Sequence, residues 1–327
     1  MQFIPALAEY EKKVNQFYLI KMKFNEYRMK KRVSIEKFMK VVTLMETIVF
    51  LRSSTALFVD ITDDHFLGFG GSKILFHLLC GFVCMASVHL RSSFIYNEAK
   101  FDNEFIWHLL KFNHVVVRNK LRRFYLNTKS YNKFKKLSRT MLSLSKFQYY
   151  VTCSGAALIQ CWTLLKGSES GFGLGTYFWV SFYIRSLQTA IGTILFFGTY
   201  NFVFSKYICY QMTFINDQFI ILLQINKVKQ EQKMMNLLKN HNNISAILSH
   251  CNSSLRLCYL ILYTSIPIID ALMFISFISK CLDDMTSTIS KPLLLEATFI
   301  WIIVNYSLSL PRAEVKMISA FYEFIFH

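Results

Sequence analysis

Nine residues carry the side-chain chemistry of a binding site for a small organic molecule, and all lie within or beside long apolar stretches. Their aromatic rings offer contact area, while their carboxylates, amide and imidazole would orient a polar or cationic group. The nine are His77, Gln160, Trp162, Tyr177, Trp179, Tyr183, Asp270, Glu296 and Trp301. We expect most of them to line one cavity. Aromatic residues at helical spacing also serve in helix packing and in interfacial belts, and that alternative stays open.

Two further residues are expected to shape the helices around such a cavity. Arg185 lies deep in an apolar stretch, where an ionisable group is costly, and we expect it to form a buried ion pair with Asp270. Pro267 removes a backbone hydrogen bond in mid-helix, so we expect a kink there, of the kind that is common in membrane helices whether or not it takes part in gating. Glu46 and Arg52 interrupt the first apolar stretch, and they are expected to pair with each other or to extend toward lipid headgroups.

Motifs for enzymatic or metal chemistry are weak. The sequence contains neither Gly-x-Ser-x-Gly nor His-Glu-x-x-His. Cys80 and Cys84 share one face of an apolar helix, without a second pair at metal-ligand spacing. We therefore predict that the chain is not an enzyme and holds no cofactor or metal. A disulfide between Cys161 and Cys281, which both lie near the ends of apolar stretches, stays open.

The composition indicates the kind of element that must position these residues. Of 327 residues 53% are hydrophobic and only 17% are charged, whereas ordinary soluble domains carry about 25% charged residues. The apolar content excludes intrinsic disorder, and eight cysteines are too sparse for a disulfide scaffold. Only 11 glycines and four prolines are present, which favours long uninterrupted helices over a turn-rich β-sheet protein. The predicted class is all-α.

Six apolar stretches approach the roughly 20 residues that a helix needs to cross about 30 Å of hydrocarbon. They cover residues 41–58, 74–96, 147–165, 172–204, 257–279 and 293–310. We therefore predict a multi-pass transmembrane helical bundle over residues 41–310. The fourth stretch is longer than a bilayer requires and has no turn signal inside it, so we expect one helix that spans the membrane and continues into water.

The distribution of basic residues predicts the orientation of these spans. Most of the 37 lysines and arginines fall in residues 1–40, 97–146, 205–256 and 311–327, whereas the short loops between the other ends hold only four. Because positive segments stay cytoplasmic, the amino terminus is predicted to face the cytoplasm. The segments 97–146 and 205–256 contain neither Gly nor Pro, and they are expected to form cytoplasmic helices.

The same distribution bears on the partners of this basic chain, whose formal net charge is +17. Its positive charge is accounted for by membrane topology, so we expect no nucleic-acid partner. Basic and aromatic residues interleave between residues 118 and 139, and that cluster is expected to lie against anionic headgroups of the inner leaflet. The lipid bilayer is thus the first expected partner.

Two short strings carry a resemblance to a known family. Leu-Lys-Asn-His-Asn-Asn-Ile at 238–244 and Ser-His-Cys-Asn at 249–252 lead into Ile266 and Pro267. Leu-Pro-Arg-Ala-Glu-Val at 310–315 follows the sixth span. With the short outer loops and the over-long fourth helix, these strings resemble the arthropod gustatory and odorant receptor superfamily, particularly divergent chelicerate gustatory receptors.

The resemblance implies a subunit of seven spans that forms a homo- or hetero-tetramer in the plasma membrane. It also implies a non-selective cation channel that opens when a small organic ligand binds. The sequence departs from the family because neither a seventh apolar span nor the family's Thr-Tyr…Gln-Phe signature follows Arg312. Two alternatives stay open: an accessory or truncated subunit without its own pore helix, and a transporter with Arg185, Asp270 and Glu296 as coupling charges.

Overall fold

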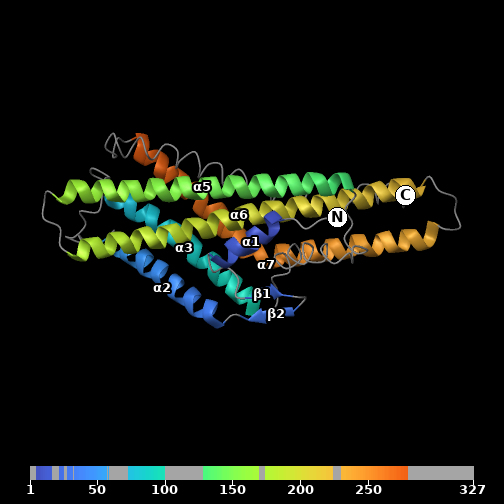
Figure 1. The fold of residues 1–327 in the computed structure, drawn as a ribbon, viewed down its shortest axis with the longest axis horizontal. Helices are drawn as coiled ribbons and strands as arrows, with labels where there is room; N and C mark the ends of the chain where they lie inside the picture. Colours follow the sequence, from blue (N-terminus) through green and yellow to red (C-terminus); the bar gives the residue numbers. More distant parts are fainter. Residues whose placement is uncertain are drawn as a thin grey trace.

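A computed structural model describes residues 5–16, 22–25, 28–31, 33–56, 58, 73–99, 128–168, 174–223 and 230–278 (Figure 1). Within these residues the chain forms six helices and one two-stranded hairpin, so the prediction of an all-α fold is confirmed. The elements are α1 (Pro5–Gln16), β1 (Met22–Asn25), β2 (Arg28–Lys31), α2 (Val33–Thr55), α3 (Lys73–Ala99), α5 (Thr128–Ser168), α6 (Leu174–Leu223) and α7 (Gln230–Ile278).

Helix α6 is the central element of the bundle. It contacts α1, α2, α3, α5 and α7, and α5 runs antiparallel beside it for much of its length (Figure 1). The shorter helices α2 and α3 pack on each other and lie beside one half of the long helices, so α5, α6 and α7 extend beyond them at the other end. We call the half that includes α2 and α3, on the left in Figure 1, the upper half, and the extension, on the right, the lower half.

The helices are longer than the apolar stretches that predicted them. Helix α6 has 50 residues and runs through the whole of 174–223 without a break, which confirms that the fourth stretch continues as one helix. Helix α5 begins 19 residues before the predicted span at 147, and α7 begins well before 257. Hydropathy falls at charged residues, but helical hydrogen bonding continues through them because Lys, Gln and Asn in these segments do not break a helix.

The core is built largely from aromatic residues of α6. Phe196, Phe197, Tyr200 and Tyr207 are fully or almost fully buried. Their partners come from two other helices: Tyr200 packs edge-on against Tyr10 of α1 with 5.9 Å between ring centroids, whereas Tyr207 lies 5.4 Å from Phe134 and Phe196 lies 6.0 Å from Tyr149, both on α5. Helix α6 thereby connects α1 with α5.

One described stretch, Tyr177–Leu222 of α6, has the length and apolar character needed to cross a membrane. The most apolar window of this stretch is 67% buried inside the bundle, and a central helix of a water-soluble protein would also meet the criterion. Residues 293–310, which are predicted as the sixth span, and residues 311–327 lie outside the described residues.

Candidate functional site

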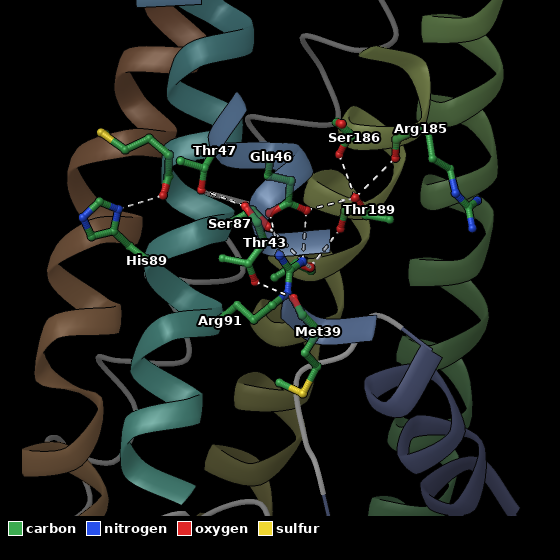
Figure 2. Close-up of polar contacts among 12 residues, drawn as sticks. Met39, Thr43, Glu46, Thr47, Ser87, His89, Arg91, Arg185, Ser186 and Thr189 are labelled. Carbon is green, nitrogen blue, oxygen red and sulfur yellow. Dashed lines mark hydrogen bonds and ion pairs between the residues drawn. The ribbon is translucent and has the colours of Figure 1, made fainter. Parts of the chain in front are cut away.

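A buried ion pair joins two helices in the upper half of the bundle. Arg91 of α3 donates from Nη1 to Oε2 of Glu46 on α2 at 2.6 Å, and from Nη2 to Oε1 at 3.0 Å (Figure 2). Both side chains are 0% exposed. The two parallel hydrogen bonds form the bidentate arrangement that suits a guanidinium and a carboxylate, so the pair fixes the mutual orientation of α2 and α3.

Hydroxyl groups extend this ion pair to α6. Thr189 Oγ1 lies 2.9 Å from Glu46 Oε1, and Arg91 Nη2 donates to Thr193 Oγ1 at 2.9 Å (Figure 2). Arg91 Nη2 also lies 3.4 Å from Ser87 Oγ on its own helix. Thr189 has a second acceptor within reach, the carbonyl of Ser186 at 2.9 Å, and its single proton serves one acceptor at a time.

Helical spacing explains why these side chains converge. Ser87 and Arg91 are four residues apart on α3, and Thr189 and Thr193 are four residues apart on α6, so each pair presents one face. We call these four residues and Glu46 the polar lock. Moving its two charges out of water is costly, and removing one partner alone would leave a buried charge unpaired, at about 3–5 kcal/mol.

The predicted pairing of Glu46 with Arg52 is wrong. Six residues on a helix correspond to about one and two-thirds turns, so the two side chains point to different sides of α2. Glu46 points inward to Arg91, whereas the guanidinium of Arg52 stacks on the ring of Trp179 at 4.1 Å from its centroid. The cation of Arg52 is thus stabilised by an aromatic face of α6.

Two of the predicted ligand-binding residues lie together near the amino-terminal end of α6. The hydroxyl of Tyr183 lies 3.5 Å from the hydroxyl of Ser53 on α2, and both residues are buried. Trp179 packs edge-on against Phe182 and Tyr183, with ring centroids 5.7 Å and 6.5 Å apart. We call Arg52, Ser53, Trp179 and Tyr183 the aromatic cluster.

His77 lies on α3, near the point where α3 packs against Ser53 of this cluster. It is buried at 2% exposure and lies one helical turn before Gly81, at which an added Cβ would meet Ser53 Cβ at 3.6 Å. Helical spacing therefore places His77 on the face of α3 that packs toward α2. Tyr177 differs, because its side chain is 46% exposed and does not belong to the buried side of α6.

The remaining predicted residues are not brought into this site by the described structure. Arg185 is exposed and is directed away from Thr189 toward α5, so the expectation that it is buried is wrong (Figure 2). Gln160, Trp162 and Asp270 occupy positions on α5 and α7, but their side chains lie outside the described part, as do Glu296 and Trp301 entirely. Pro267 lies inside α7, which continues through it to Ile278.

Arg91 and its hydroxyl partners were missed by the sequence reading. The signal was present, because Arg91 is the only charged residue within the apolar stretch 77–93, and an ionisable residue in such a stretch indicates a buried partner. Thr189 and Thr193 carried no signal, since threonines in apolar helices usually bond their own backbone, as Thr193 does to the Thr189 carbonyl at 2.8 Å.

The described residues give limited information on metal ligands and on a disulfide. Among the described residues no group of three His, Cys, Asp or Glu side chains could hold a metal ion. Cys161 is exposed on α5, and Cys281 lies outside the described residues, so a disulfide between them stays a prediction.

An open groove lies at the far end of the lower half, between the end of α6 and the beginning of α7. Its volume is about 530 Å³, and none of the predicted site residues lines it. The lining residues are Gln218, Ile221, Leu222, Lys233, Asn236, Leu237 and Asn240. The polar lock and the aromatic cluster therefore stand apart from this groove.

Comparison of the chain with family models, with curated proteins and with solved structures finds no match in any of the three.

Proposed function

We propose that this chain is a multi-pass membrane protein of the gustatory-receptor type, a subunit of a plasma-membrane cation channel that opens when a small organic ligand binds. The observation that carries the membrane part is a reversal of the usual distribution of polarity. In the upper half, large apolar side chains point outward while a complete ion pair is enclosed among the helices.

The outward apolar side chains occur on four helices. On α2 they follow one another at helical spacing, from Phe38 through Val41 and Leu44 to Leu51, and each is more than half exposed. The others are Phe147, Tyr150 and Leu158 on α5, Tyr177 and Phe178 on α6, and Leu260 and Ile268 on α7. Water penalises such faces, whereas lipid chains are as apolar as the side chains themselves.

The length of α5 beyond Lys146 fits a bilayer. From Phe147, where the exposed face of α5 becomes apolar, to the end of the helix at Ser168 is about 32 Å at 1.5 Å per residue. The hydrocarbon core of a bilayer is about 30 Å thick. The upper half would thus occupy the membrane, and the lower half of α5, α6 and α7 would extend into the cytoplasm.

The aromatic cluster supports a ligand site at the outer end of the upper half. Trp179 and Tyr183 offer ring faces and a hydroxyl, His77 offers an imidazole, and Arg52 brings a cation held against an aromatic ring. Rings with a few placed polar groups are what a small organic ligand requires. The tetramer and the pore rest on the family resemblance alone. The arrangement of a bundle with long helices extending from one end of it agrees with that resemblance.

The orientation is tested with epitope tags on the full-length chain expressed in cells. One tag precedes Met1, and a second is inserted within 169–173, between α5 and α6. On intact cells we expect antibody to reach the second tag and not the first, and both after permeabilisation. Access to the first tag on intact cells would contradict the topology and, with it, the receptor assignment.

The receptor function is tested by electrophysiology on the same cells, with a panel of tastant-like organic compounds. We expect ligand-evoked cation current that is weakened by Trp179→Ala, with exposed Tyr177→Ala as the matched control. Accumulation of a substrate at fixed stoichiometry without channel-like current would instead support the transporter alternative.

A further inference from the structure

Three lysines and one glutamate gather where α1 meets α5. Helix α1 is fixed there by Tyr10, which is fully buried and packs edge-on against Tyr200 of α6. Glu9, which directly precedes Tyr10, pairs with Lys146 of α5, and one turn after Tyr10 the Nζ of Lys13 lies 5.9 Å from the ring centroid of Phe196. Lys12 is exposed beside them. Two elements far apart in sequence thus place three ammonium groups around one carboxylate.

The charges in this cluster act on one another. The pKa of Lys13 is lowered, first by burial and then by the neighbouring charge of Lys146, with Lys12 adding to the effect and Glu9 opposing it. The lysines are therefore close enough to repel one another. An anion bound between them would relieve this repulsion, because opposite charges nearby favour the charged form of an amine.

The position of the cluster says what kind of anion fits. Lys146 directly precedes Phe147, which is 66% exposed and is the first of the large apolar side chains on the outward face of α5. Tyr150, 60% exposed, follows one turn later on the same face. A molecule with a negative head and an apolar tail would place its head at the lysines and its tail along Phe147 and Tyr150.

We propose that Lys12, Lys13 and Lys146 form a binding site for the headgroup of an anionic phospholipid, whose acyl chains lie against Phe147 and Tyr150. The proposal rests on the membrane placement proposed above and adds a defined lipid site to it. Its ligand is a bilayer lipid with net negative charge, such as phosphatidylserine. Lysines at the cytoplasmic surface are where such lipids are attracted.

The experiment measures lipid binding to the purified full-length chain by native mass spectrometry, with equal amounts of phosphatidylserine and phosphatidylcholine in the micelle. We expect bound phosphatidylserine to exceed phosphatidylcholine. The double variant Lys12→Ala/Lys13→Ala should weaken phosphatidylserine binding about 30-fold, since each lysine near an anionic lipid surface contributes roughly fivefold. Lys12→Ala alone, at an exposed position that leaves α1 packed, should weaken it about fivefold.

The matched control is Lys129→Ala/Lys133→Ala, which removes two exposed lysines from the same helix as Lys146. On the membrane placement proposed above, these two lysines lie in the cytoplasmic extension of α5 and not against the headgroups, where the sequence alone led us to expect residues 118–139. Lys133 lies about 20 Å along α5 from Lys146, about two Debye lengths in physiological salt, so binding should change less than twofold. Lys12→Arg/Lys13→Arg should keep the preference. Equal losses in the lysine cluster and the control, or removal of the preference by millimolar inorganic phosphate, would overturn the site.

Failure of this site is distinguishable from failure of the membrane placement. Extraction of cell membranes with alkaline carbonate reports whether the unaltered chain is integral to the bilayer. A chain released by carbonate would refute the membrane proposal and this site with it. A chain that stays in the membrane but binds both lipids equally would refute the lipid site alone.

Discussion

The two halves of α5 share one outward face but present opposite chemistry on it. In the lower half the exposed positions include Lys129, Lys133 and Lys136, and on the same face of the upper half they become Phe147, Tyr150 and Leu158. Helix α7 shows this change less clearly: its lower part exposes Lys233 and Lys239 but also Met235, and its upper part exposes Leu260 and Ile268. One helix thus presents two different kinds of surface along its length.

The interiors of the two halves show the opposite distribution of charge: the half with the apolar exposed face is the one that buries an ion pair. The lower half is filled by aromatic contacts such as Phe134 with Tyr207, and its buried polar contact is neutral, from Gln211 Nε2 to the Tyr207 hydroxyl at 2.8 Å. The upper half encloses the charges of Glu46 and Arg91. Burial alone therefore does not identify the surroundings of a helix, whereas the chemistry of its exposed face does.

The largest expected effect comes from breaking the polar lock. Arg91→Leu leaves the Glu46 carboxylate buried without its cation and should destabilise the bundle by about 3–5 kcal/mol. Thermal unfolding of the purified protein, followed by loss of the monodisperse chromatographic peak, would measure it. Glu46→Leu/Arg91→Leu, which removes both charges, should recover most of the loss, and exposed Arg139→Leu should cost nearly nothing. A double variant no better than Arg91→Leu would contradict the pairing.

The difference between the exposed faces of the two halves is tested by introducing a lysine at one position in the upper half of α5 and at another in its lower half. Leu158→Lys places an ammonium on the proposed lipid face and should cost about 2.5–3.5 kcal/mol, whereas Ser143→Lys, on the part of α5 proposed to be cytoplasmic, should stay within about 0.5 kcal/mol. The fraction of chain that inserts into microsomes measures both. If Leu158→Lys inserts as well as Ser143→Lys, the upper half does not face lipid.

A smaller effect is expected where α6 joins the lock. Thr189→Val keeps the shape of the side chain but removes its hydrogen bond to Glu46, and bonds to charged groups contribute about 1.5–3 kcal/mol. The same measurement of thermal unfolding applies. Thr213→Val, which removes an exposed hydroxyl that bonds only the Cys209 carbonyl at 2.9 Å, is the control and should change little. Equal shifts in the two variants would exclude Thr189 from the lock.

The smallest effect on stability is expected in the aromatic cluster. Tyr183→Phe removes a hydroxyl that lies 3.5 Å from Ser53, a distance at the long limit for a hydrogen bond, and should cost less than about 1 kcal/mol. Its effect should instead appear in the ligand concentration for half-maximal current. Exposed Tyr177→Phe should leave that concentration unchanged, and an equal change in both variants would argue against a site at Tyr183.

The sequence predicted what depends on local rules. The scarcity of glycine and proline predicted an all-helical chain, and the absence of a turn signal near Arg185 predicted that α6 is continuous, as it is from 174 to 223. Each of these follows from neighbours along one chain. Packing against other helices is not needed to derive them.

The polar lock and the docking of α1 depend on packing and could not be derived in this way. Pairing Glu46 with Arg91 requires the relative height and rotation of α2 and α3, which are 45 residues apart at these positions. The hairpin from β1 to β2 was missed because Asn25 and Arg28 flank its turn without the Asn-Gly or Asp-Gly pair that marks a two-residue turn. Tyr10 gave no sign of its burial against Tyr200, since one aromatic residue among charged neighbours has no helical pattern.

The unbroken length of α6 has a mechanical consequence. The helix behaves as a stiff rod held near Thr189 and Thr193, with about 45 Å of it, some 30 residues, extending from Thr193 to its inner end. A tilt of about 5° around that fulcrum displaces the inner end by roughly 4 Å. The same tilt corresponds to a shift of only about 1 Å beside Tyr183, which lies about 15 Å from Thr193 on the other side, so a small displacement there goes with a threefold larger one at the far end of α6.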